Sequence, residues 1–87
     1  MTLAAHEQIR AELTRLLGLV RDTFPAEQTR YVEDFITANE YQLALEWILD
    51  GMAELQVPIS PDAASLVREL ASRLGVLDVI APRLERL

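Results

Sequence analysis

A row of carboxylates is the part of the sequence with the clearest potential for chemistry. Glu46, Asp50 and Glu54 recur every four residues, and Glu33 and Asp34 form an adjacent pair upstream. Paired carboxylates act as general acid and base, or bind metal ions, when they face a protected interior. A di-metal helical bundle needs Glu-x-x-His pairs, and the sequence has none. An apolar stripe already fills the inner side of the same segment. We therefore expect the row to lie outside, without a catalytic or metal-binding role.

Other residue types that carry out catalysis are scarce. His6 is the only histidine and lies near the N-terminus. We expect its side chain to be solvated there, and not to be held as a general base. There is no cysteine, which excludes disulfides and thiolate metal sites, and the three glycines form no phosphate-binding loop. The sequence therefore predicts no enzyme, no cofactor and no metal site.

The net charge of −6 is unevenly distributed along the chain. Residues 31–67 contain seven acidic residues and no basic one (net −7), whereas the rest contains seven acidic residues and eight arginines (net +1). This balance argues against a nucleic-acid or anionic membrane partner and favours a basic protein partner. Like charges four residues apart destabilise a helix by about 0.2–0.5 kcal/mol per pair. No basic residue within residues 40–55 offsets them, so we interpret the row as a partner-binding face. A merely solvated face is the alternative.

The elements that position these residues are expected to be helices. Segments with helical periodicity are expected in a single domain at about residues 3–21, 25–38, 40–55, 61–74 and 78–86. The connections are short, which favours antiparallel neighbours. The expected fold class is all-α: a compact antiparallel bundle of four helices plus a short C-terminal fifth helix. For the last segment, two separate turns divided near Pro82 are the alternative.

Several residues mark helix ends. Thr2 is a candidate N-cap, and Ser60-Pro61-Asp62 is the strongest helix start in the sequence. Asn39 is expected to end the second helix and cap the third. Gly75 is expected to adopt a left-handed C-terminal cap, and Asp78 to cap the fifth helix.

Apolar periodicity predicts which side chains are buried. In residues 40–55 the predicted buried stripe is Tyr41, Ala44, Leu45, Ile48, Leu49, Met52 and Leu55, and in residues 25–38 it is Tyr31, Val32, Phe35 and Ile36. Gly18 could allow close approach of a neighbouring helix. Trp47 lies with Leu43 beside the acidic row, and both a buried ring and an exposed binding ring are compatible with that position.

The N-terminal residues and the apolar runs indicate where in the cell the protein is expected to be. The N-terminal residues lack a basic region followed by an apolar run, so no signal peptide is expected. The longest apolar runs are only a few residues, too short for a membrane span. Together with the lack of cysteine, this favours a cytoplasmic protein.

The segment around the third helix resembles a known family. Phe35 to Glu46, with Glu40-Tyr41 followed by Leu-Ala-Leu-Glu, and the later Ile59-Ser60 resemble the signature of the Maf-type (MafI-family) immunity proteins. These are small helical proteins encoded beside secreted bacterial polymorphic toxins. The resemblance covers about residues 31–75. It implies an intracellular protein that binds and neutralises a cognate toxin domain.

The resulting hypothesis is an immunity protein that forms a stoichiometric complex with a toxin, through an acidic helical face that blocks a basic toxin cleft. The alternative is a small helical adaptor or homo-oligomerisation domain without a toxin partner, which the apolar content of 51% would support. A homodimer is compatible with either hypothesis. The residues expected to contact the partner are Glu33, Asp34, Glu40, Leu43, Glu46, Trp47, Asp50 and Glu54.

Overall fold

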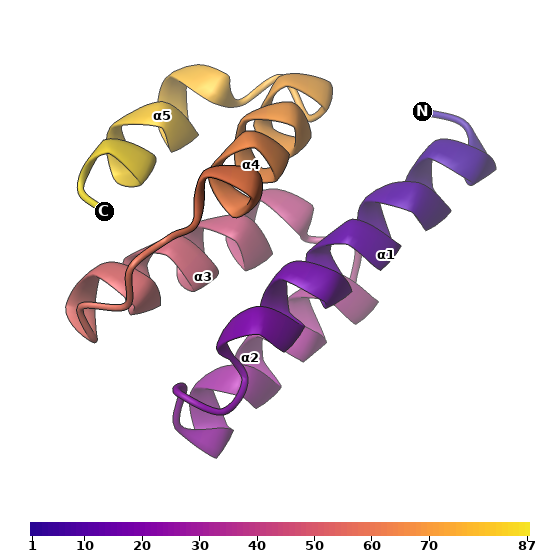
Figure 1. Cartoon of the computed structure of the whole chain (residues 1–87). Coiled ribbons are helices and arrows are strands. Elements are labelled where there is room, and N and C mark those ends of the chain that lie inside the picture. Colours follow the sequence, from indigo (N-terminus) through magenta and orange to yellow (C-terminus); the bar gives the residue numbers. More distant parts are fainter.

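Five helices form the fold. The computed structural model describes residues 1–87, with α1 (Leu3–Val20), α2 (Ala26–Thr37), α3 (Tyr41–Glu54), α4 (Pro61–Arg73) and α5 (Leu77–Glu85). Successive helices reverse direction and pack into a bundle (Figure 1), which confirms the all-α fold class. The observed helix ends differ from the expected ones by at most one residue. The last segment is one helix that continues through Pro82, so the alternative of two separate turns is wrong. None of the helices is both long and apolar enough to cross a bilayer.

Two helices begin at the predicted N-cap residues. Thr2 Oγ1 accepts the backbone N–H of Ala5 at 3.1 Å, and Ser60 Oγ accepts that of Ala63 at 3.1 Å. Each hydroxyl satisfies an N–H that has no partner within the helix, and a cap of this kind contributes about 1 kcal/mol. The prediction that Asp78 caps α5 is wrong. The N-cap is Val76, and Asp78 lies in the first turn, where its charge favours the helix dipole.

Three helices end with a left-handed residue. Asn39 (φ 64°), Gln56 (φ 56°) and Gly75 (φ 71°) follow α2, α3 and α4. Beyond each, a backbone N–H bonds back to the last turn, as from Glu40 to the Phe35 carbonyl at 2.8 Å. The predicted roles of Gly75 and of Asn39 as helix ends are confirmed. Asn39 does not cap α3, because the N-cap is Glu40, which makes no side-chain capping bond.

Helix α3 lies at the centre and contacts α1, α2 and α5. Its buried side chains follow the predicted stripe: Tyr41, Ala44, Leu45, Ile48, Leu49 and Met52. Leu55 is an error in that prediction, because it follows the end of α3 and is 40% exposed. On α2 the buried face consists of Thr29, Val32 and Ile36, with Phe35 partly buried. Tyr31 lies outside this face and is 46% exposed, so its predicted burial is also wrong.

Two glycines within helices have opposite roles. An added Cβ at Gly18 would meet nothing within 4 Å, so the proposed close approach of a helix there is wrong. At Gly51, which is buried in α3, a Cβ would lie 2.0 Å from Gln28 Nε2 and 2.9 Å from Phe24 Cζ. The side chains of α2 and of the turn before it therefore approach α3 closely at Gly51.

This difference predicts opposite effects of alanine. Gly18→Ala should raise the free energy of unfolding by about 0.5–1 kcal/mol, because alanine has the higher helix propensity and the site is open. Gly51→Ala should lower it by about 1 kcal/mol, because displacing the buried Phe24 ring outweighs the propensity gain. Urea unfolding of both variants provides the measurement. An equal gain in stability for both would contradict the close approach at Gly51.

Candidate functional site

The row of Glu46, Asp50 and Glu54 borders two different neighbouring helices. Residues four apart on an α-helix are offset by about 40° around the axis, so Glu54 is turned about 80° from Glu46. As a result the row winds from the α5 side of α3 to its α2 side. Glu46 pairs with α5, whereas Glu54 lines a groove against α2, and Asp50 does both.

Arginines of α5 balance the charge at the start of this row. Arg83 Nη1 lies 3.6 Å from Glu46 Oε1, and Arg83 Nε lies 3.2 Å from Asp50 Oδ1. Arg86 Nη1 is 4.0 Å from the same Asp50 oxygen. The contact of Arg83 with Asp50 Oδ1 is ionic, since the hydrogen bond from Arg83 Nε goes to Oδ2 at 3.5 Å. No basic residue within α3 offsets the repulsion, but arginines from the α5 segment do so for Glu46 and Asp50.

The other expected contact residues are dispersed. Glu33 Oε1 lies 3.6 Å from Arg21 Nη1, on the side of α2 that faces α1. Asp34 and Glu40 are exposed and form no ion pair. Leu43 is 39% exposed, one turn before Trp47. The eight expected residues thus spread over several sides of the molecule, and only Trp47, Asp50 and Glu54 line a common hollow.

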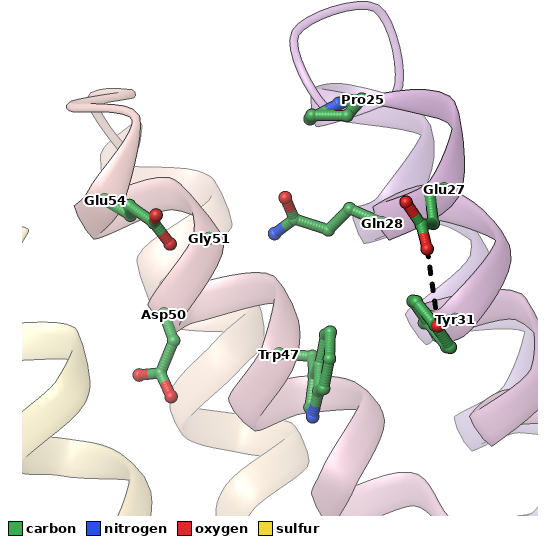
Figure 2. Close-up of a pocket in the computed structure, with 8 residues that line it drawn as sticks. All are labelled: Pro25, Glu27, Gln28, Tyr31, Trp47, Asp50, Gly51 and Glu54. Carbon is green, nitrogen blue, oxygen red and sulfur yellow. Dashed lines mark hydrogen bonds between the residues drawn. The ribbon is translucent and has the colours of Figure 1, made fainter.

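That hollow is a groove between α2 and α3. It has a volume of about 670 Å³ and opens to solvent. Figure 2 shows side chains of α2 on one side and of α3 on the other, with Trp47 between them. The groove is lined by Pro25, Glu27, Gln28, Tyr31, Trp47, Asp50, Gly51 and Glu54. On α3 these residues have the spacing i, i+3, i+4 and i+7, so they form one stripe along the helix.

Trp47 is both packed and accessible. Its ring centroid lies 5.5 Å from that of Tyr31 and 5.5 Å from that of Phe35, in tilted arrangements. Such pairs of aromatic rings contribute about 0.5–1.5 kcal/mol beyond the area they bury. Even so, 40% of Trp47 and 46% of Tyr31 remain exposed. Of the two readings of Trp47, the exposed ring is the one in the structure, held in place by α2.

The absence of a side chain at position 51 shapes the wall below the aromatic rings. The amide of Gln28 extends from α2 toward Gly51 (Figure 2), and a Cβ there would overlap it. Because glycine leaves this space free, the amide lines the groove with no Cβ in its way. The groove therefore has a neutral polar group next to its aromatic surface.

The carboxylates at the rim are only partly balanced. Glu27 and Glu54 are exposed, and neither forms an ion pair. Glu27 Oε1 accepts the Tyr31 hydroxyl at 3.4 Å, a long hydrogen bond. Asp50 already contacts Arg83 and Arg86, and 48% of its side chain is exposed. The groove therefore combines accessible aromatic surface with two unpaired negative charges.

Sequence reasoning missed the α2 half of the groove. Apolar periodicity places Tyr31 in the predicted buried stripe, and Glu27, in the first turn of α2, is not among the expected contact residues. The spacing of Thr29, Val32 and Ile36 defines the true centre of the buried face and leaves Tyr31 outside it. Glu27 and Tyr31 are four residues apart and so lie on the same side of α2, which was the sequence signal for this half of the groove.

A second polar cluster joins the N-terminal helix to α3. The hydroxyl of Tyr41 donates to Asn39 Oδ1 at 3.0 Å and lies 3.3 Å from His6 Nδ1. Arg10 Nη2 donates to the same Asn39 oxygen at 2.5 Å. His6 is thus partly buried, and its expected solvation is wrong. Tyr41, part of the Glu-Tyr pair, is 5% exposed, which makes its role structural.

Comparison with known proteins gives no family for the chain. No family model, curated protein or solved structure matches it. The resemblance to Maf-type immunity proteins stays a prediction from the short motif. The geometry of the groove is therefore the main guide to function.

Proposed function

We propose that this chain is an immunity protein that binds a cognate secreted toxin domain and neutralises it by stoichiometric complex formation. The observation that carries the proposal is the exposed Trp47 in a groove whose rim carries the unpaired carboxylates Glu27 and Glu54. The motif at Glu40-Tyr41 and residues 43–46, which resembles Maf-type immunity proteins, supports a toxin as the partner.

The aromatic rings support a protein partner. Tryptophan and tyrosine are enriched among the interface residues that contribute most to affinity, usually inside pockets that lose water on binding. Trp47 and Tyr31 are already held by packing between α2 and α3. Little side-chain entropy would be lost when a partner covers them.

The charge supports a basic partner surface. Toxin domains that act on nucleic acids or nucleotides need basic clefts for phosphate. The acidic surface around the groove, placed over such a cleft, would compete with phosphate for the same basic side chains. With a net charge of −6, the chain would also attract such a surface at long range and speed association at low salt. We place this complex in the cytoplasm, where an immunity protein would meet incoming toxin. Inhibition of this kind needs no catalytic group or cofactor.

Co-expression tests the proposal. The chain should restore growth to bacteria that produce the toxin domain encoded beside its gene, and the two proteins should co-elute as an equimolar complex in size-exclusion chromatography. The complex should form more slowly as salt is added, because steering is screened over about 10 Å at 0.1 M salt. If growth is not restored and no complex forms, the immunity proposal fails.

A further inference from the structure

We infer that the α2–α3 groove binds an arginine side chain presented by the protein partner. The guanidinium would stack on the exposed part of Trp47 and donate to the carboxylates of Glu27 and Glu54. This inference rests on the proposed function and specifies the chemical group that the partner inserts.

The placement of charge around the ring supports a cation. Glu27 comes from α2 and Glu54 from α3, and Figure 2 shows them on opposite sides of the groove. A cation over the Trp47 face would therefore have a carboxylate on either side. Cation–π contacts favour tryptophan over other rings, and they strengthen as the cation loses water. The amide of Gln28 adds a neutral polar group along the wall.

The combination of an aromatic ring with two separate carboxylates favours arginine over lysine. A guanidinium is planar, stacks on aromatic faces and is more weakly hydrated than an ammonium group. Its N–H groups point outward in one plane, so it can bind two separate carboxylates while it stacks on a ring. A lysine ammonium is a compact, strongly hydrated charge and lacks this geometry. The volume of about 670 Å³ leaves space for the side chain with its aliphatic stem.

On the other side of α3, carboxylates already pair with arginines of the chain itself. Arg83 from α5 contacts Glu46 and Asp50, and Arg86 approaches Asp50. On the α2 side, Glu54 and Glu27 have no such partner. On α3, Glu46 and Asp50 are thus paired with arginine, whereas Glu54, which lines the groove with Asp50, is unpaired. An arginine from outside would complete the pattern.

Fluorescence of Trp47, the only tryptophan, measures binding directly. The probes are short glycine peptides, blocked at both ends, with a central arginine, lysine or the neutral isostere citrulline. The arginine peptide should change the emission saturably. The lysine peptide should bind about threefold more weakly, and the citrulline peptide about tenfold more weakly. Glu27→Gln with Glu54→Gln should weaken arginine binding about tenfold.

A matched control separates local contact from overall charge. Glu7 and Glu85 are exposed carboxylates outside the groove and form no ion pair. Glu7→Gln with Glu85→Gln removes the same charge and should leave the affinity for the arginine peptide unchanged. Equal weakening by both double variants would overturn the inference. So would equal affinity for arginine and lysine peptides, or no saturable change with the arginine peptide.

Two further outcomes distinguish this inference from the proposed function. If the arginine peptide binds as expected but the toxin does not, the immunity proposal fails and the arginine site stands. If the toxin binds equally well to the chain with Glu27→Gln and Glu54→Gln, the arginine site is overturned and the immunity proposal stands. Sedimentation should also show a monomer. A dimer that dissociates on Glu27→Gln with Glu54→Gln would assign the groove to a second copy and overturn the inference.

Discussion

Replacing Arg83 with methionine is expected to lower the free energy of unfolding by about 1–2 kcal/mol, although Arg83 lies outside the central helix. Its guanidinium provides the counter-charge for Glu46 and Asp50 and donates to the Val79 carbonyl at 3.2 Å. Only 15% of the Glu46 side chain is exposed, so its charge would be left with little water and no cation. The Arg83 side chain is 30% exposed, which keeps the loss below the value for a fully buried pair.

Arg86→Met is the control for this prediction. The Arg86 side chain is 66% exposed and lies 4.0 Å from Asp50, so its loss should cost less than about 0.5 kcal/mol. Adding Glu46→Gln to Arg83→Met should recover part of the lost stability, because the charge without a partner is removed. Urea unfolding of the variants provides all of these values. Equal small losses for Arg83→Met and Arg86→Met would contradict the role of the α5 arginine.

Reversal of the two rim charges is expected to abolish partner binding without unfolding the chain. Glu27→Lys with Glu54→Lys places two positive charges where the proposed arginine would bind. Like charges across an interface cost several kcal/mol, so the affinity should fall more than about 100-fold. Glu46 and Asp50 are left intact in this design, because lysines there would face Arg83 and report on folding. Titration calorimetry with the toxin domain provides the affinity.

The fold of this variant needs a separate measurement. Glu27 lies in the first turn of α2, so its reversal also costs about 0.3–1 kcal/mol of helix stability. Thermal melting by circular dichroism measures that loss. Glu7→Lys with Glu85→Lys changes the net charge equally at sites outside the groove. This control variant should associate with the toxin domain more slowly, because electrostatic steering is reduced, but it should keep most of its affinity. If the control loses as much affinity as the rim variant, total charge explains binding and the groove does not.

Local signals accounted for most of the fold. The hydroxyls of Thr2 and Ser60 bond to N–H groups three residues away, so sequence alone was enough to place those helix starts. The α3 stripe of Tyr41, Leu45 and Ile48 follows directly from helical periodicity. The errors occur at the edges of such patterns. Leu55 follows the last turn of α3, and Tyr31 lies beside the buried face of α2 and not within it.

The candidate site depends on contacts between residues that are far apart in the sequence, and such contacts could not be predicted from local patterns. Arg83 is 33 residues from Asp50 and His6 is 35 residues from Tyr41, so neither pairing has a local pattern. Residues 31–67 contain no basic residue, so the sequence alone identifies no partner for any carboxylate of α3. The fold divides them instead into Glu46, paired with α5, and Glu54, which stays free in the groove.

The tertiary structure also separates the motif from the groove. Tyr41 is buried, and its hydroxyl connects Asn39 to His6. Glu46 pairs with Arg83, so two residues of the family-like motif have structural roles in this chain. The groove is formed by other residues, chiefly Trp47 and Glu54 on α3 and Tyr31 on α2. On this basis a protein could share the motif for its fold and carry different groove residues for a different partner.

Fluorine NMR of the single Trp47 tests the central claim most directly. The chain is labelled with fluorotryptophan and titrated with the unlabelled toxin domain, so the one resonance reports only on the groove. If the partner binds over Trp47, the resonance should shift, saturate at equimolar toxin and lose its sensitivity to the proportion of heavy water. An unchanged resonance under conditions where the complex forms would show that the toxin binds elsewhere, and would contradict the α2–α3 groove as the interface.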